Sequence, residues 1–434
     1  MQQIDFKLNN EIKVHLIKND KYKTDLLALF LTVPLQRENI TKNALIPIVL
    51  KRGCNKLKTQ NEINEKLEEM YGAVFDAGLD KTGDNLIIKF YLESINDNFL
   101  PGDNQNIEKA IELITNIVFE PLIENGSFIK EFVDSEKNNL KVIIESKKDN
   151  KDRYALDRCI NSIYGDNGYG LSKLGYIEDF ESIDEKNLYQ EYLKLIKNSK
   201  IDFFISGNFD EEKISIKVKS LENNSLLNNR EEIFKKNDFR EEKKEKTDEI
   251  KEIKEKMDVT QGKLVIGLDI LPNNLGDYRF IAAMYNTILG DGANSKLFQN
   301  VREKAGLAYT AKSNYIIQKN NIFIRCGIEI DNYNKAVDII KEQLEDIKNG
   351  NFSDDDIENG KKYIVSGIKS IYEEQDTEII FSYGQEISPI PVTPEEYKDR
   401  IKKVTKEQIV EFAQNICINT IYFITDKNIW WWGK

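Results

Sequence analysis

Histidine and cysteine are scarce in this chain, and each scarcity excludes a class of site. The 434 residues contain one histidine, His15, so no zinc site with two histidine ligands can form within the chain. The four cysteines, Cys54, Cys159, Cys326 and Cys417, are widely spaced and form no C-x-x-C pair. We therefore expect reduced thiols, used as small apolar side chains, in a cytoplasmic protein.

Long hydrophobic runs are also missing. The longest apolar stretches, such as Leu26–Pro34, fall far short of the ~20 residues of a membrane-spanning helix. The N-terminus has no basic segment followed by an apolar one, so no signal peptide is expected. Lys and Arg total 62 against 74 Asp and Glu, a net charge of −12, which argues against a general nucleic-acid binder. Since 40% of its residues are hydrophobic, we expect a folded protein. From the missing apolar runs and the negative charge, we expect neither a membrane nor a nucleic acid as partner.

One charged segment divides the chain near its middle. Residues 228–257 are dense in Lys and Glu and poor in apolar residues, as is typical of a solvated linker. The segment separates an N-terminal domain, 1–227, from a C-terminal domain, 258–434. Two parts of similar size invite a search for an internal repeat.

The two halves show the same order of expected elements. Alternating hydrophobicity predicts strands at 12–17, 26–33, 85–92, 201–206, 263–270, 322–330 and 420–425. Helical spacing of apolar residues predicts helices within 107–118, 128–162, 337–347, 354–374 and 397–416, the last with Thr405 as an N-cap that could divide it. Lys109–Ile114 and Lys335–Ile340 are also locally similar. We expect an α+β fold of two homologous domains, each a mostly antiparallel sheet covered by helices, joined by the charged linker.

Few residues offer chemistry by themselves. His15 lies on a predicted strand with no catalytic partner near it in sequence, so a structural or surface role is the simpler interpretation. Asp354–Asp356 follow Ser353 at a predicted helix start, where negative charge offsets the helix dipole. Gly290–Ser295 is glycine-rich but lacks the order of a phosphate-binding loop, and we expect a loop between two helices.

The segment 295–309 combines an arginine and a tyrosine. A helical apolar stripe runs to Gly306, a natural helix stop, and Tyr309 begins the next strand. A helix end followed by a strand can bring Arg302 and Tyr309 to one surface. From the residues alone, an ordinary helix–turn–strand with a solvated Arg302 is the better explanation.

This segment resembles the C-terminal-domain signature of the pitrilysin/insulinase metallopeptidases, the inverzincins, which include mitochondrial processing peptidase. The similarity lies in Gly290–Gly292, Ser295–Phe298, Val301–Lys304 and Gly306–Tyr309. Two further stretches resemble family motifs: Gly207–Asp210, and Tyr169–Gly170 followed by Gly175, the latter without the histidine and proline of the family. The resemblance covers nearly the whole chain, including the duplicated halves and the linker.

The resemblance implies a zinc site that this chain lacks. Family members carry H-x-x-E-H on an N-terminal-domain helix, where two histidines bind zinc and the glutamate activates water. The similar helix here, Asn43–Gly53, has Ala44 and Ile48 at the histidine positions and Pro47 at the glutamate position. Glu145 is the candidate for the family's further zinc-binding glutamate, but one carboxylate does not make a site. We expect no bound metal in this chain and no zinc-peptidase activity of the chain alone.

The resemblance also implies a partner. Some family members are heterodimers in which a zinc-bearing and a zinc-free subunit close over a peptide. Zinc-free subunits are similar in carrying an Arg and a Tyr, seven residues apart, that reach toward the partner's zinc, and Arg302 and Tyr309 have this spacing. Arg can bind a peptide carbonyl or carboxylate, and Tyr can donate to the tetrahedral oxyanion. The resemblance therefore implies a non-catalytic subunit with Arg302 and Tyr309 as substrate-binding residues, zinc in an active homologous partner, and a peptide substrate.

Alternatives to this interpretation remain open. The chain could be a structural or peptide-binding homologue with no proteolytic activity in any assembly, as are the family's core subunits in respiratory complexes. A self-sufficient peptidase would need a nucleophile and a base, and we recognise no such constellation. The C-terminal Trp430–Trp432 could pack on the final strand or contribute to an interface, and packing is the commoner case.

Overall fold

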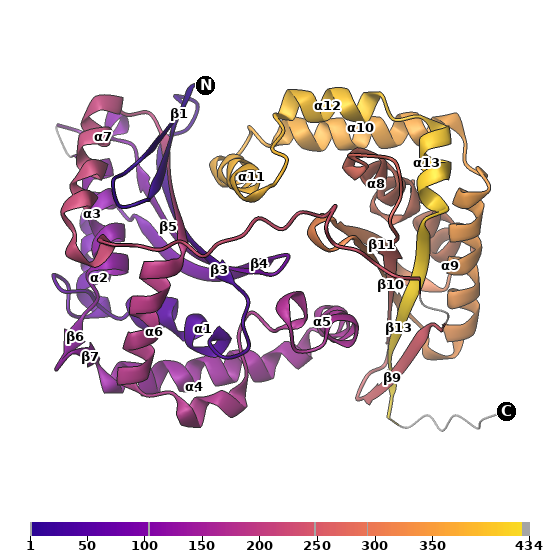
Figure 1. The fold of residues 1–434 in the computed structure, drawn as a ribbon, viewed down its shortest axis with the longest axis horizontal. Coiled ribbons are helices and arrows are strands. Elements are labelled where there is room, and N and C mark those ends of the chain that lie inside the picture. Colours follow the sequence, from indigo (N-terminus) through magenta and orange to yellow (C-terminus); the bar gives the residue numbers. More distant parts are fainter. Residues whose placement is uncertain (1, 103–104, 247–248, 293, 428–434) are drawn as a thin grey trace. The chain divides into compact units, whose positions relative to one another are not determined.

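The computed structural model describes residues 2–102, 105–246, 249–292 and 294–427, which form two units with one large sheet each (Figure 1). Unit 1 comprises Met1–Glu145, Asp166–Lys236 and Tyr372–Gly384, and unit 2 comprises Ser146–Gly165, Asn237–Ile371 and Gln385–Lys434. The two units therefore do not coincide with the two halves of the sequence. Trp430–Trp432 lie outside the described residues.

The sheet of unit 1 has six strands in the order β1-β2-β8-β3-β5-β4. The bounds are Gln2–Lys7 (β1), Lys13–Lys18 (β2), Thr24–Pro34 (β3), Val74–Thr82 (β4), Asn85–Ile95 (β5) and Lys200–Gly207 (β8). β2 and β8 are parallel, and the other neighbours are antiparallel. β3 and β8 lie inside the sheet and are buried almost throughout, as their largely apolar sequences predict.

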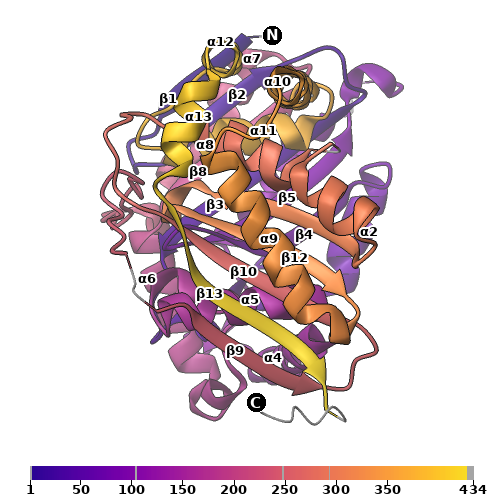
Figure 2. The ribbon, with the colours of Figure 1, turned by 90° about the vertical axis from the view of Figure 1, so that its right-hand side faces the viewer.

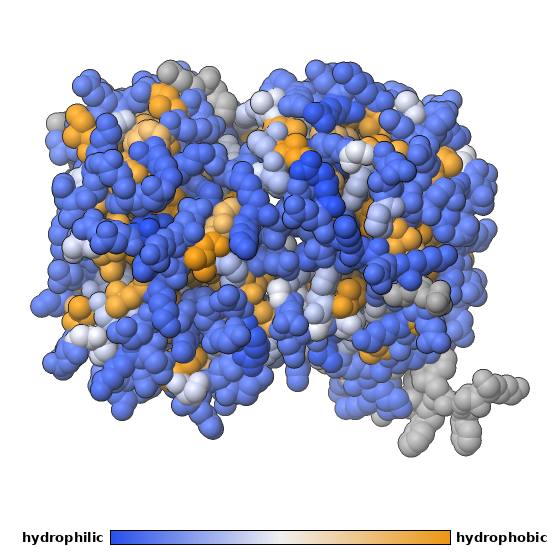
Figure 3. Space-filling model, in the orientation of Figure 1, coloured by the Kyte–Doolittle hydropathy of each residue, from blue (hydrophilic) through white to orange (hydrophobic). Residues whose placement is uncertain are grey.

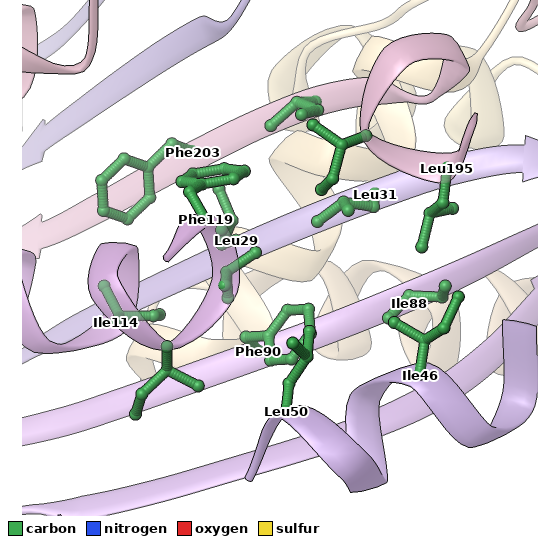
Figure 4. Close-up of a cluster of buried hydrophobic side chains, with 14 of the residues drawn as sticks. Leu29, Leu31, Ile46, Leu50, Ile88, Phe90, Ile114, Phe119, Leu195 and Phe203 are labelled. Atoms are coloured by element: carbon green, nitrogen blue, oxygen red, sulfur yellow. The ribbon is translucent and has the colours of Figure 1, made fainter. Parts of the chain in front are cut away.

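Helices cover one face of this sheet and form the core of unit 1. They are α1 (Ile40–Leu50), α2 (Gln60–Glu69), α3 (Asn106–Phe119), α4 (Lys130–Ser146), α6 (Glu185–Asn198) and α7 (Glu211–Lys219), with a small hairpin of β6 (Ile123–Glu124) and β7 (Ser127–Phe128). Figure 4 shows Leu29 and Phe90 of the sheet among side chains from the helices, including Leu50 of α1, Ile114 of α3 and Leu195 of α6. Close packing of these apolar side chains accounts for much of the stability of unit 1.

The sheet of unit 2 has five strands in the order β11-β12-β10-β13-β9 (Figure 2). The bounds are Lys251–Met257 (β9), Gly262–Ile270 (β10), Ala308–Ile316 (β11), Asn321–Ile328 (β12) and Ile416–Asp426 (β13). Its helices are α8 (Arg279–Asn286), α9 (Tyr333–Lys348), α10 (Asp354–Ser370), α12 (Pro394–Lys402) and α13 (Lys406–Ala413), with two π-helical segments, η7 (Thr287–Asp291) and η8 (Phe298–Lys304). Thr405 caps α13 by accepting the Gln408 N–H, so the predicted division at Thr405 is confirmed.

The two sheets repeat one another. Taken from β9, the sheet of unit 2 runs β9-β13-β10-β12-β11, which matches β2-β8-β3-β5-β4 of unit 1. The first pair is parallel and the others are antiparallel in both sheets. The similar strings Lys109–Ile114 and Lys335–Ile340 lie on the equivalent helices α3 and α9. These matches support an internal duplication, and the predicted α+β fold of two sheet-and-helix regions is confirmed.

The duplicated halves exchange one helix each. α5 (Lys151–Tyr164), from the first half of the sequence, packs on β10 and β13 of unit 2, where Cys159 and Ile163 lie over Gly267. α11 (Gln375–Ile387), from the second half, packs on the unit 1 sheet through Gln375 and Tyr383. Each sheet is thus covered on its second face by a helix from the other half.

Two elements of the structure differ from the prediction made from the sequence. Lys251–Met257, inside the predicted linker 228–257, form β9 at the edge of a sheet. An edge strand tolerates these Lys and Glu side chains because it is exposed to water, and their charge discourages pairing with other chains. The predicted helical run 128–162 is two helices, α4 and α5, separated by a tighter turn at Lys147–Asp149.

The face of the molecule seen in Figure 3 is mostly polar, with scattered apolar residues. Across the described part of the chain, none of the helices combines the length and apolar character that crossing a bilayer requires. None of the four cysteines is paired in a disulfide in the structure, and Cys54, Cys159 and Cys326 are buried. Burial raises the pKa of the Cys159 and Cys326 thiols to about 12, which leaves them unreactive.

Candidate functional site

Helix α1 carries apolar side chains where the resemblance places the zinc motif. Ala44 is fully buried, Pro47 is buried inside the helix, and Ile48 is half-buried against the unit 1 core. Hydrocarbon side chains have no lone pair to offer a metal ion. Among the residues that the structure describes, no three His, Cys, Asp or Glu side chains gather around α1.

The candidate glutamate of α4 does not face a metal site. Glu145 is exposed near the end of α4. The buried carboxylate of this helix is Glu136, 3% exposed, with Oε1 3.3 Å from Nη1 of Arg52 just after α1. The guanidinium of Arg52 also lies 5.2 Å from the ring centre of Phe132. Glu136 is therefore held in an ion pair that links α4 to the end of α1.

The only histidine is occupied by structural contacts. His15 is fully buried, with Nδ1 2.8 Å from Oδ1 of Asp5 and Nε2 3.4 Å from Oδ1 of Asp202. Its ring stacks on Phe204 at 4.1 Å. Burial alone would lower the His15 pKa, but the two carboxylates outweigh it and raise the pKa. His15 therefore links β1, β2 and β8 from a buried position, as a structural role requires and a surface role does not.

The sequence analysis did not identify the two carboxylates around His15, although the position of Asp202 in its strand could have indicated one of them. Asp202 is a charged residue inside an apolar strand run, and a charge in a buried strand requires a compensating partner. Lys200 supplies a second one through an ion pair with Asp202. Asp5 could not be paired with His15 from sequence because the contact depends on the register of β1 against β2.

The family-like stretch Tyr169–Gly175 lies against the start of α1. Gly175 has φ +71°, and a Cβ there would overlap Thr41. The Thr41 hydroxyl donates to Asp179, and Arg37 donates to the same carboxylate with Nη1 and Nη2 at 2.7 and 3.0 Å. Burial would raise the Asp179 pKa, but Arg37 and Thr41 together hold it below its usual value. The glycine and the ion pair together fix the entry into α1.

Arg302 lies in unit 2, in the last turn of the π-helical segment η8. Its guanidinium carbon lies 4.6 Å from the ring centre of Phe298, and Nε is 3.5 Å from Oε1 of Glu303. The side chain remains 44% exposed, so its remaining N–H groups are open to an acceptor. Phe298 supports the flat face of the guanidinium while its edge stays accessible.

Tyr309 is presented by an irregularity at the start of β11. In the pairing with β12, Ala308 lies opposite Ile328 and Thr310 opposite Gly327, so Tyr309 is an extra residue in the strand. Such a bulge re-aims a side chain, and the Tyr309 side chain is 71% exposed on an edge strand. The family resemblance singled out the tyrosine, but nothing in the sequence indicated the bulge.

A short turn connects these two side chains. Gly306 has φ +63°, and the Leu307 N–H donates to the Val301 carbonyl at 3.0 Å, a common way to end a helix. The predicted helix stop is thus confirmed. Within the described residues no hydrogen bond or ring contact joins Arg302 and Tyr309. Both are open to solvent on either side of the turn.

Comparison with known proteins gives a consistent result. Residues 182–364 match the protein family described as "Peptidase M16 inactive domain". The chain is 32% identical over 414 residues to a probable inactive metalloprotease, YmfF, of Bacillus subtilis strain 168, covering 95% of each chain. It is also 22% identical over 262 residues to an uncharacterized zinc protease, YmxG, of the same strain, covering 60% of each chain.

Solved structures show the same fold. A conserved protein from Enterococcus faecalis V583 matches with a TM-score of 0.87 and 26% identity, over 99% of this chain and 100% of its own. A peptidase M16 inactive domain from Pseudomonas fluorescens matches with a TM-score of 0.77 and 14% identity, over 98% of each chain. The α+β architecture is therefore shared along nearly the full length.

Proposed function

Because this chain belongs to the M16 (pitrilysin-type) peptidase family as an inactive, non-catalytic member, we propose that it serves as the zinc-free subunit of a heterodimeric metallopeptidase. The observation that carries the proposal is the apolar character of α1, where Ala44, Pro47 and Ile48 stand at the positions that the resemblance assigns to the metal-binding and catalytic side chains. A fold kept along its whole length without its zinc motif is suited to completing a chamber around a partner's site. The partner would be a homologous chain that bears H-x-x-E-H and holds the zinc.

Arg302 and Tyr309 are the residues we assign to this task. Both side chains are exposed. The Arg302 guanidinium rests on the ring of Phe298, and the bulge of β11 directs Tyr309. In the proposed pair, the Arg302 guanidinium would bind a carbonyl or carboxylate of the peptide, and the Tyr309 hydroxyl would donate to the oxyanion formed at the partner's zinc. We place the pair in the cytoplasm, since the four thiols are unpaired.

Affinity capture of the tagged chain from its native lysate tests this proposal. Mass spectrometry and metal analysis of the eluate should find a homologous chain with H-x-x-E-H in near-equal amount, together with zinc. The eluate should also cleave unstructured peptides, and a chelator should abolish that activity. Recovery of this chain alone, without zinc, would contradict the proposal and favour a peptide-binding or structural homologue without proteolytic activity.

A further inference from the structure

Unit 2 contains a cavity that the proposed function does not use. Its volume is about 290 Å³, and it lies between η8 with its preceding turn on one side and α9 and α10 on the other. Ser295, Lys296 and Asn300 line the first side, and Asp346, Asp356 and Tyr363 line the second. Neither Arg302 nor Tyr309 is part of the lining. The size is at the lower end of small-molecule sites, which suits a ligand of amino-acid dimensions.

The most buried polar side chain of the lining has no partner. Ser295 is 2% exposed, and its hydroxyl forms no hydrogen bond in the described structure. The residue precedes a helical segment whose first bond runs from the Gln299 N–H to the Ser295 carbonyl at 2.9 Å. Serine in this position normally caps the helix with its side chain, but here it does not. A buried hydroxyl without a partner is unfavourable and calls for an acceptor or donor in the cavity.

Ser295 also stands where a helix favours an anion. The first backbone N–H groups of a helical segment have no acceptor within it and carry the positive end of the helix dipole. The hydroxyl of Ser295 and these amide groups together would suit the two oxygens of a carboxylate. The free hydroxyl, rather than the helix end alone, singles out this helix start.

The charges around the cavity select among ligands. Lys296 Nζ lies 3.3 Å from Oδ2 of Asp346, and Lys304 Nζ donates to the Asn300 amide oxygen at 3.0 Å. Asp356, also in the lining, accepts from Ser353. Since both signs are present, a simple anion would face carboxylates and a simple cation would face ammonium groups. A molecule with one carboxylate and one ammonium group satisfies both.

We propose that this cavity binds a free α-amino acid or dipeptide, with the carboxylate at Ser295 and the ammonium group toward Asp346 and Asp356. Tyr363, 48% exposed, offers an aromatic surface to the side chain of the ligand. The π-helical segments η7 and η8 border the cavity, and π-helical turns are rare and frequent at functional sites. The inference does not depend on the proposed peptidase partner.

Binding is tested on the purified full-length chain with each common α-amino acid and with glycylglycine. At least one should raise the melting temperature and bind in calorimetry. Its C-terminal amide and its N-acetyl derivative should each bind more weakly by about tenfold or more, because each loses one charged contact. No binding by any of these ligands, or derivatives that bind as well as the parent, would overturn the proposal.

Two variants locate the site. S295A should weaken the best ligand by about tenfold while leaving the melting temperature of the free protein unchanged or higher, since no hydrogen bond of the free protein is lost. The matched control is S182A, an exposed serine of unit 1 that donates only to the Asp179 carbonyl, and it should bind normally. Equal affinity of S295A and the wild type would overturn the assignment. If S295A does not fold, the ligand derivatives still decide the question.

Discussion

The phenol of Tyr383 hydrogen-bonds the hydroxyl of Thr32, a residue 351 positions earlier in the chain. Both side chains are buried, Thr32 on β3 and Tyr383 on α11. The Tyr383 ring also lies 4.3 Å from the ring of Phe30 and 6.3 Å from that of Phe204. A side chain from late in the sequence thus packs on the second face of the unit 1 sheet.

Two substitutions of Tyr383 should destabilise unit 1 to different extents. Tyr383→Phe leaves the Thr32 hydroxyl buried without a partner, which should cost about 1–3 kcal/mol. Tyr383→Ala also removes the ring and should cost about 3–5 kcal/mol. Urea unfolding at constant pH measures both free energies. Tyr309→Phe, at a tyrosine 71% exposed, is the control and should stay within about 0.5 kcal/mol of wild type. A Tyr383→Phe value that small would show that the bond contributes nothing.

Stability should fall between about pH 4 and pH 7 because of Asp25. Burial raises its pKa to about 7, although Asn96 donates to Oδ1 at 2.6 Å and favours ionisation. The folded state therefore keeps a proton that the unfolded state has lost above pH 3.8. The stabilisation that this proton gives the folded state is complete below pH 3.8 and is lost by pH 7. Between these values the free energy of unfolding falls by up to ~1.4 kcal/mol per pH unit.

Asp25→Asn is the variant that isolates this effect. The amide has the same shape, cannot ionise, and keeps an acceptor for Asn96. Chemical unfolding at several pH values should show a shallower decline for the variant than for wild type over this range. Parallel curves for the two proteins would show that Asp25 ionises normally.

Gly175 should be among the least replaceable glycines. In Gly175→Ala the new methyl group would meet the side chain and Cα of Thr41, in a backbone conformation that L-residues avoid. We expect a loss of about 3 kcal/mol or more, since strain and the disturbed Thr41–Asp179 contact add. Gly72 also has positive φ, but no atom lies within 4 Å of the place that a methyl group would take, so Gly72→Ala should cost only about 1 kcal/mol. Thermal unfolding of both variants makes the comparison, and equal melting temperatures would refute the steric argument.

The proposed pair predicts an effect of Arg302 and Tyr309 on rate rather than on assembly. Tyr309→Phe should lower the peptidase rate of the captured complex by about 10²–10³, the effect of losing one oxyanion donor. Arg302→Ala should act mainly by weakening peptide binding, seen as a raised KM. Each variant should co-purify with the partner as wild type does, and Tyr71→Phe should have normal rates. Normal rates for both site variants would remove these residues from the mechanism.

Most strands and helices could be predicted because their periodicity is local. β3, β5, β8, β10 and β13 are apolar runs near the middle of a sheet, and the structure confirms each. The strands that escaped prediction lie at sheet edges or in the small β6–β7 hairpin, and helices α2, α6, α7, α8 and α11 were not predicted either. β4 and β9 have many charged side chains, because one side of each strand faces solvent, so their composition is that of a loop or linker. The sheets on which α5 and α11 pack could not be predicted either. The spacing of apolar residues shows that one face of a helix is apolar, but not which sheet that face will cover.

The candidate site could be predicted only in part. Gly306 follows from residue type as a helix stop, whereas Arg302 and Tyr309 were assigned through the family resemblance; the structure shows the turn and the exposure of both side chains, and their role stays a prediction. The bulge that presents Tyr309 depends on pairing with β12, which has no local signal. The unpartnered hydroxyl of Ser295 is likewise a property of the assembled unit, because it depends on what the surrounding helices fail to offer.

The exchange of α5 and α11 has a consequence for synthesis on the ribosome. The sheet of unit 1 has all its strands once β8 ends at Gly207, yet the helix that covers its second face begins only at Gln375. At ~5–20 residues per second, that face waits roughly ten to thirty seconds for its cover. During this interval Phe30 and Phe204 are exposed to other nascent chains. A copy of α11 from a neighbouring chain could fill the place, so slow translation or truncation before Tyr383 should favour entangled dimers or aggregates.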